Sequence, residues 1–360
     1  MLARPGQLSD AALAQALSAG WDITPAVMEY RAVGYGSHHW EVTAGRDHRW
    51  FVTVDDLAAR LRSSADSLDV AYGRLRSALR TARAIYEAGA LFVVAPVRTA
   101  DGDVVRRIGE TYAIAVYPYL DGCSRQFGDT WSAGDGGVAL TLIAAVHAAP
   151  AHACRSALTD DFGVPGGDAL IHALDDLAIR WDNGPYGEPA RQLLAAHAVE
   201  LRRLLERRDQ LAAQARRRPD RMVPTHGEPH PGNFLQVGSR WMLVDWDTVL
   251  IAPPERDLWL LDSGDGSIAD AYRQATGRVV VPSMLDLYRL TWELSDLASC
   301  AARFRQGHAD TAEDRKDWEI LSGSRLIVVD PGPVVDPVYP HAPDRPPSPD
   351  PPPKRVSEIP

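Results

Sequence analysis

The sequence has almost no lysine. Lys316 and Lys354 are the only two among the 38 basic side chains of this 360-residue chain, so nearly every cation is an arginine. A mechanism that needs a lysine in the first half of the chain therefore has no candidate there.

Cysteine and long apolar runs are also scarce. The three cysteines, Cys123, Cys154 and Cys300, are widely separated and odd in number, which argues against a disulfide framework and against a thiolate zinc site. No stretch approaches the roughly 20 apolar residues of a membrane-spanning helix, and the N-terminus MLARPGQLSD lacks the apolar core of a signal peptide. These absences predict a cytoplasmic protein with no membrane partner.

The charge balance bears on the ligand. Acidic side chains outnumber basic ones by 48 to 38, for a net charge of -10. This excess disfavours nucleic acid as a partner and favours neutral or cationic ligands. The apolar content of 45% is ample for a large globular core.

The first third of the chain has the pattern of a small β-rich lobe. Residues 7–20 predict a short helix that begins after Ser9 and ends at Gly20. Strands are predicted over about 28–57, with Gly34 and Gly36 in the first turn, and again over 90–99 and 111–120. Between them, apolar residues recur every three to four positions over 68–88, which predicts an amphipathic helix.

The rest of the chain is mostly helical. Helices are predicted over about 138–148, 168–179, 188–215 and 283–306, and one β-hairpin over 233–247. The last residues are so rich in proline that neither helix nor sheet can persist. We therefore predict an N-terminal helical segment (1–24), an N-lobe (25–118), a helical C-lobe (119–330) and a disordered tail (331–360).

The stretch THGEPHPGNFL, residues 225–235, concentrates chemically capable side chains. Three interpretations compete for it. His226, Glu228 and His230 alternate, as metal ligands on one face of an extended segment would. Glu228 and Asn233 have the offset of the base and the metal ligand in a phosphoryl-transfer loop. The segment could also be a turn without chemistry.

The hairpin favours phosphoryl transfer. This reaction needs oxygen ligands for metal ions and one proton acceptor, because catalysis is mostly positioning and charge stabilisation. Asp245 ends the hairpin that begins after Asn233, so the chain returns to the loop at that point. Asn233 and Asp245 could then share a magnesium ion that bridges the phosphates.

The motif HGEPHPGNFL followed by LVDWD resembles the aminoglycoside phosphotransferase and choline kinase group of small-molecule kinases. The resemblance implies an α+β, two-lobed protein-kinase-like fold with a small antiparallel N-lobe and a larger helical C-lobe. It also implies that Glu228 is the catalytic base, that Asn233 and Asp245 are the metal ligands, and that Asp257 braces the loop. His226 would pack under the loop, and His230 would shape it.

Two positions depart from the family pattern. The base is normally aspartate, and Glu228 adds one methylene while remaining a carboxylate. The third strand normally carries a lysine that grips the phosphates, and Thr53 occupies its place in FVTVDDL. An arginine must substitute, and we expect it on the following helix, at one of three positions: Arg76, Arg80 or Arg83.

The resemblance also implies the binding sites. The nucleotide is expected at Gly34, Gly36 and Ser37, at Arg80, and at Tyr117 and Tyr119 in the run AVYPYLDG. The helical lobe is expected to form the acceptor wall with the aromatic Trp292 and the acids Asp182, Glu293 and Asp296, and these acids would suit an amine.

The sequence therefore predicts a kinase that uses ATP or GTP with Mg²⁺ to phosphorylate a hydroxyl group of a small molecule, an antibiotic being the favoured acceptor. Two alternatives stay open: a catalytically impaired, kinase-like ligand-binding protein, and a metal-dependent hydrolase.

Overall fold

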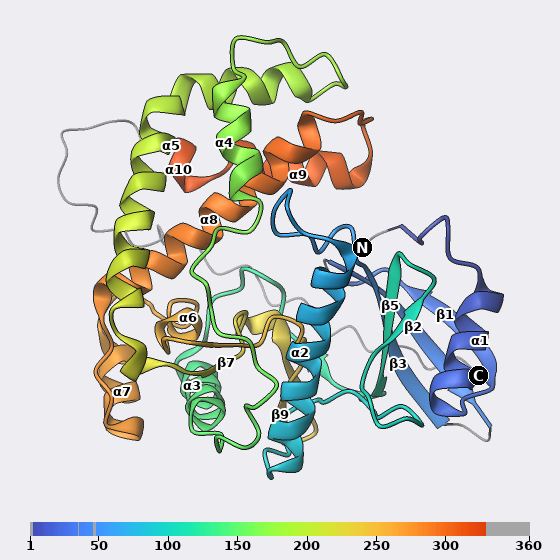
Figure 1. Cartoon of the computed structure of the whole chain (residues 1–360). Helices are drawn as coiled ribbons and strands as arrows, with labels where there is room; N and C mark the ends of the chain where they lie inside the picture. Colours follow the sequence, from blue (N-terminus) through green and yellow to red (C-terminus); the bar gives the residue numbers. More distant parts are fainter. Residues whose placement is uncertain (1–2, 35, 46–47, 329–360) are drawn as a thin grey trace.

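The computed structural model of the chain describes residues 3–34, 36–45 and 48–328. The predicted tail, 331–360, and Tyr35 of the predicted turn lie outside the described residues. The chain forms two lobes, a β-rich N-lobe and a helical C-lobe (Figure 1).

The N-lobe is an antiparallel sheet with one helix on each face (Figure 1). The strand order is β1-β2-β3-β5-β4. Its elements are α1 (Asp10–Trp21), β1 (Pro25–Arg31), β2 (Ser37–Ala44), β3 (His48–Asp56), α2 (Leu68–Glu87), β4 (Arg106–Ile108) and β5 (Tyr112–Pro118). The predicted first three strands and the helix over 68–88 are confirmed.

Side-chain alternation along β3 assigns the two faces of the sheet. Val52 and Val54 pack with α1, and Phe51 packs with the α2 cluster on the opposite face. Leu13 and Leu17 of α1 are fully buried in the first cluster. The N-terminal segment is thus packed as part of the N-lobe, and Ser9 caps α1 by accepting a hydrogen bond from Ala12 N.

The prediction of a strand over residues 90–99 is wrong. Its backbone hydrogen bonds are divided between two partners, since Val94 N donates to the Leu243 carbonyl and Val97 N donates to the Val116 carbonyl. Pro96 has no N–H with which to continue a ladder. The segment therefore crosses from one lobe to the other as an extended connection, and β4 takes the edge of the sheet.

The C-lobe contains the remaining elements. Its strands are β6 (Cys123–Ser124), β7 (Val223–Thr225), β8 (Phe234–Val237), β9 (Arg240–Leu243) and β10 (Leu250–Ala252). Its helices are α3 (Ala133–His147), α4 (Gly167–Asp175), α5 (Gly187–Arg216), α6 (Glu255–Leu258), α7 (Ser267–Thr276), α8 (Pro282–Phe304), α9 (Ala312–Ser322) and α10 (Arg325–Val328). None of the helices in the described residues is long and apolar enough to span a membrane.

The four predicted C-lobe helices correspond to α3, α4, α5 and α8, and the predicted hairpin is β8–β9. Helices α7 and α9 were not predicted. Helix α9 begins with a capping box formed by Thr311 and Asp314, a local signal that the sequence does contain.

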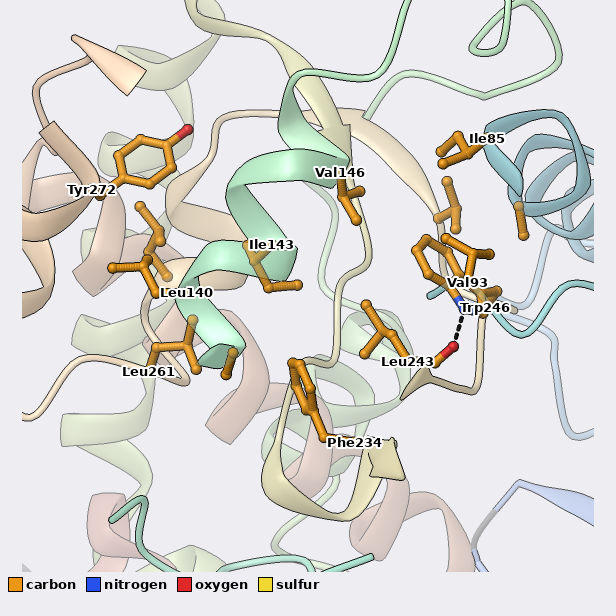
Figure 2. Close-up of a cluster of buried hydrophobic side chains, with 14 of the residues drawn as sticks. Ile85, Val93, Leu140, Ile143, Val146, Phe234, Leu243, Trp246, Leu261 and Tyr272 are labelled. Atoms are coloured by element: carbon orange, nitrogen blue, oxygen red, sulfur yellow. Dashed lines mark hydrogen bonds between the residues drawn. The ribbon is translucent and has the colours of Figure 1, made fainter. Parts of the chain in front are cut away.

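A buried cluster under the hairpin supports its position (Figure 2). Ile143 of α3 belongs to this cluster, together with Phe234 and Leu243 of the hairpin. The Trp246 indole is fully buried there, and its Nε1 donates to the Leu243 carbonyl over 2.7 Å. These three hairpin residues flank Asn233 and Asp245, so the core determines where those polar residues lie.

We expect Leu17→Ala to destabilise the N-lobe by about 2–5 kcal/mol, because it leaves a cavity between α1 and the sheet. The matched control is Leu91→Ala, at a leucine whose side chain is 66% exposed, for which we expect a change within about 0.5 kcal/mol. Denaturant unfolding followed by tryptophan fluorescence measures both. Equal midpoints would show that α1 does not pack on the sheet in solution.

Candidate active site

A buried carboxylate anchors the loop between β7 and β8. Asp257, in α6, accepts hydrogen bonds from His226 N over 2.9 Å and from Gly227 N over 2.6 Å. His147 Nε2 lies 3.0 Å from the same carboxylate, and the other nitrogen of that ring bonds the Tyr272 hydroxyl. The brace that the family resemblance implied for Asp257 is present in the structure.

Gly227 is required at its position. Its φ is +105°, and a Cβ there would lie 2.5 Å from the Arg256 guanidinium and 2.6 Å from Thr248 Oγ1. Arg256 itself donates to the Thr225 hydroxyl and to the Thr248 carbonyl, under the loop. A side chain at residue 227 would push the loop away from its support.

Both ring nitrogens of His226 are engaged within the loop. Nε2 donates to the Val244 carbonyl over 2.8 Å, and Nδ1 accepts from Glu228 N. His230 Nδ1 accepts from Gly232 N, which caps the 3₁₀ turn Pro231–Asn233. Burial lowers the pKa of His226, and it lowers that of His230 to about 4, so both rings are neutral near pH 7.

These bonds argue against the hydrolase interpretation, because His226 has no nitrogen left for a metal. In the part of the chain that the structure describes, no three histidine, cysteine, aspartate or glutamate side chains form a metal cage. His226 packs under the loop and His230 shapes it, as the resemblance implied.

The hairpin brings Asn233 and Asp245 together. Phe234 pairs with Leu243 in the β8–β9 register, and Val244 N donates to the Asn233 carbonyl over 3.0 Å. Asn233 Nδ2 donates to the Glu228 carbonyl over 2.9 Å, which turns Oδ1 away from that carbonyl. One short segment thus fixes both residues relative to Glu228.

Asp245 has an unusual backbone conformation, with φ of +66°. Non-glycine residues in this left-handed region are uncommon and cluster at functional sites. Asp245 is exposed to solvent, and the N-lobe residues Arg60 and Asp55 lie close enough for their charges to act on its carboxylate. Desolvation by the surrounding protein, together with the charges of Asp247 and Glu228, raises the pKa of Asp245 well above its usual range.

Glu228 shares this environment. Burial, followed by the charge of Asp247, raises the pKa of Glu228 to about 7, and the charge of Asp296 adds to the effect. The site therefore gathers carboxylates whose mutual repulsion a cation would relieve.

The residues fit a magnesium ion. An amide oxygen and a carboxylate are hard oxygen donors, and Mg²⁺ is usually held by one or two protein carboxyl or amide groups together with phosphates and water. The placement of Asp245 near the carboxylates of Asp247 and Glu228, whose charges add to burial in raising its pKa, supports the fit. Asn233 and Asp245 are the side chains that would hold it.

An ionic chain that the sequence did not predict connects the two lobes. Arg60, in the turn after β3, donates to Asp55 over 2.6 Å and also bonds Asp247 of the C-lobe. Ser37 donates to Asp55 over 2.6 Å and accepts from Arg60 over 3.2 Å. Although burial opposes ionisation, Arg60 holds the pKa of Asp247 below its usual range. The available signal was the second acid in LVDWD, two residues after Asp245.

The predicted nucleotide residues lie in different environments. Gly34 and Gly36 have φ of +69° and +82°, as a tight turn requires, and Ser37 is buried beside Asp55. Tyr117 is buried against α2, and burial followed by the charges of three aspartates raises its pKa well above the usual range. The Tyr119 ring lies 3.6 Å from the Arg49 guanidinium.

The three helix arginines are engaged elsewhere. Arg76 and Arg80 both pair with Asp103, and Arg83 pairs with Glu87. The Arg80 side chain is 40% exposed in its pair. The structure thus does not bring Arg80 to the site, because the α2 arginines find carboxylates within their own lobe.

The predicted acceptor residues separate into two places. Trp292 lies between Phe127 and Trp259, with ring centroids 6.1 Å and 5.7 Å away. Glu293 and Asp296 are half-buried on the same helix; burial raises both pKa values, that of Asp296 to about 7, and the charge of Glu293 adds to the latter.

Asp182 is not brought to this group. It pairs with Arg180 and is 67% exposed. Its neighbour Asn183 bonds the Arg305 carbonyl at the far end of α8, and the 13 residues from Trp292 to Arg305 span about 20 Å of helix.

The family comparison covers most of the chain. A family model described as the phosphotransferase enzyme family matches residues 34–288. Protein StrN of Streptomyces griseus is 28% identical over 258 residues, which are 69% of this chain and 76% of that protein.

Solved structures share the fold. A spectinomycin phosphotransferase in complex with ADP and spectinomycin matches with a TM-score of 0.67 and 13% identity, over 89% of this chain and 97% of that one. A microcompartment-associated aminopropanol kinase matches with a TM-score of 0.56 and 16% identity, over 88% of this chain and 95% of that one. The two-lobed, kinase-like fold predicted from the sequence is confirmed.

We expect Asp257→Ala to lower the free energy of unfolding by about 3 kcal/mol or more, because the buried N–H groups of His226 and Gly227 lose their acceptor. Asp209→Ala, at a side chain that is 75% exposed, is the control and should change stability by less than about 1 kcal/mol. Thermal and denaturant unfolding test both. A loss no larger than that of the control would mean that Asp257 does not anchor the loop.

Proposed function

The chain belongs to the phosphotransferase enzyme family, and from this premise we propose that it transfers the γ-phosphoryl group of ATP or GTP to a hydroxyl group of a small molecule. The observation that carries the proposal is the juxtaposition of Glu228, Asn233 and Asp245 by one loop and one hairpin. Those three side chains supply one proton acceptor and two oxygen ligands, which is the set that the reaction needs.

These three residues have two different roles in the proposed reaction. Asn233 and Asp245 would hold Mg²⁺, which when bound would neutralise charge on the phosphate oxygens. Glu228 orients the acceptor hydroxyl and takes its proton. The acceptor oxygen bonds the γ-phosphorus, the bond from that phosphorus to the β–γ bridging oxygen breaks, and the nucleoside diphosphate leaves.

We propose that the acceptor lies against Phe127, Trp292 and Asp296. Aromatic faces and an acid next to them suit a ligand that carries an amine. Asp296 is close enough to Glu228 to raise its pKa, so an acceptor held there would reach the base. Among the structural relatives, one was crystallised with ADP and the antibiotic spectinomycin, which supports a nucleotide and an antibiotic as the two substrates here.

The direct test incubates the protein with labelled ATP or GTP, magnesium and a panel of antibiotics that includes aminoglycosides and spectinomycin. We expect one acceptor to gain the mass of a phosphoryl group in mass spectrometry. Nucleotide binding without a mass gain on any acceptor would instead support a kinase-like ligand-binding protein.

We expect Asp245→Asn to abolish nucleotide consumption while the thermal midpoint stays near that of the wild type, because a neutral amide binds the metal weakly. Glu228→Gln should reduce kcat by about 10²-fold or more with little change in nucleotide affinity. Steady-state kinetics and thermal unfolding measure these effects. Retained turnover in Asp245→Asn would remove that residue from the metal site.

For the acceptor, Trp292→Ala and Asp296→Asn should each raise the acceptor KM about tenfold and leave the nucleotide KM unchanged, because both side chains lie on the acceptor side of Glu228. Asp209→Asn is the matched control at an exposed position of α5. If instead the nucleotide KM rises in the two variants, the acceptor lies elsewhere.

A further inference from the structure

The structure offers a different arginine for the place left by the missing lysine. Thr53 stands on β3 where the lysine was expected. The four arginines of α2 pair with carboxylates of the N-lobe, namely Asp66, Asp103 and Glu87. Arg256 is committed to the Thr225 hydroxyl and the Thr248 carbonyl under the loop. Arg60 instead bonds Asp247, two residues from Asp245.

We propose that Arg60 binds the phosphate chain of the nucleotide in place of a β3 lysine, with Asp55 as the carboxylate that positions it. This inference rests on the proposed function, since it assigns a role at the same site.

Position supports this assignment. The Arg60 guanidinium lies 3.2 Å from Ser37, the residue that directly follows Gly36. It also bonds Asp247, beside the candidate metal ligand Asp245. A phosphate chain that reached from Ser37 to a metal held by Asp245 would pass the guanidinium, which bonds both Ser37 and Asp247.

The hydrogen bonds of Arg60 leave part of it available. Nε and Nη2 donate to Asp55, Ser37 and Asp247, and no bond from Nη1 to another described residue is present. A guanidinium has five donors in a rigid fork, which suits phosphate oxygens. Its side chain is 17% exposed, so its direction is set by its partners before a ligand arrives.

Charge supports the same assignment. Asp55, Asp247, Asp245 and Glu228 make this region strongly acidic, and a triphosphate adds further negative charge. A cation fixed among these carboxylates lowers the electrostatic cost of binding the phosphates.

The position of Asp55 and Arg60 relative to Thr53 also suits a substitute for the missing β3 lysine. Val52 and Val54 point into the α1 core, so Thr53 and Asp55 share the opposite face of β3. Asp55 is one pleat, about 7 Å, further along that face than Thr53. Here the strand supplies the acid and the following turn supplies the cation.

The test compares Arg60→Gln with Asp247→Asn by calorimetric titration of ATP and of adenosine in EDTA, so that metal binding does not contribute. We expect Arg60→Gln to weaken ATP binding about tenfold or more and adenosine binding less than about twofold, because the lost bonds reach only phosphate. Asp247→Asn breaks the same interlobe contact but keeps the guanidinium, so ATP should bind at least as tightly as in the wild type.

The control is Arg98→Gln, at a 45% exposed N-lobe arginine paired with Glu87, which should leave both affinities unchanged. Unchanged ATP affinity in Arg60→Gln would overturn the inference. Equal losses of ATP affinity in Arg60→Gln and Asp247→Asn would also overturn it, because they would show that Arg60 only holds the two lobes together. In either case, phosphorylation of an acceptor by the wild type would leave the proposed function standing. A wild type that binds neither ATP nor GTP when Mg²⁺ is present would overturn both.

Discussion

The site depends on the hydrogen bonds from His226 N and Gly227 N to the Asp257 carboxylate. They hold the first residues of a loop whose later residues include Glu228 and Asn233. The carboxylate is fully buried and is connected through His147 to Tyr272. The loop is therefore anchored to the core of the C-lobe. Breaking hydrogen bonds to a buried carboxylate costs free energy, because the charge would lose its donors. These bonds therefore keep the short loop rigid, so that its side chains point in fixed directions.

A second constraint is electrostatic. Several carboxylates converge between the lobes, and within the described residues the Arg60 guanidinium bonds two of them, one from each lobe. Carboxylates this close together repel one another unless a cation lies among them. Such a site suits a reaction in which a metal ion enters with a nucleotide. Burial and the neighbouring carboxylates raise the pKa values of Asp245 and Glu228, while Arg60 lowers that of Asp247 although burial opposes it.

Local patterns predicted much of the fold. Periodicity located α2, α3, α5 and α8, and the turn Gly238–Arg240 between two apolar runs located the hairpin. The family resemblance drawn from the loop and hairpin is confirmed by the family match over residues 34–288. The strand expected over 90–99 failed because an apolar run can be buried without pairing in a ladder, and this one divides its hydrogen bonds between two lobes.

The sequence by itself determined the order and spacing of Glu228, Asn233 and Asp245, because a loop and a hairpin are built from residues close in the chain. Only the tertiary structure placed the Arg60 guanidinium against Asp247, two residues after Asp245. Arg60 and Asp247 are 187 positions apart, and no periodicity or spacing rule relates residues at that separation. The tertiary structure also places Arg80 and Asp182 away from the site. Arg80 pairs with Asp103 and Asp182 pairs with Arg180, because a charged side chain pairs with the opposite charge that packing places nearest.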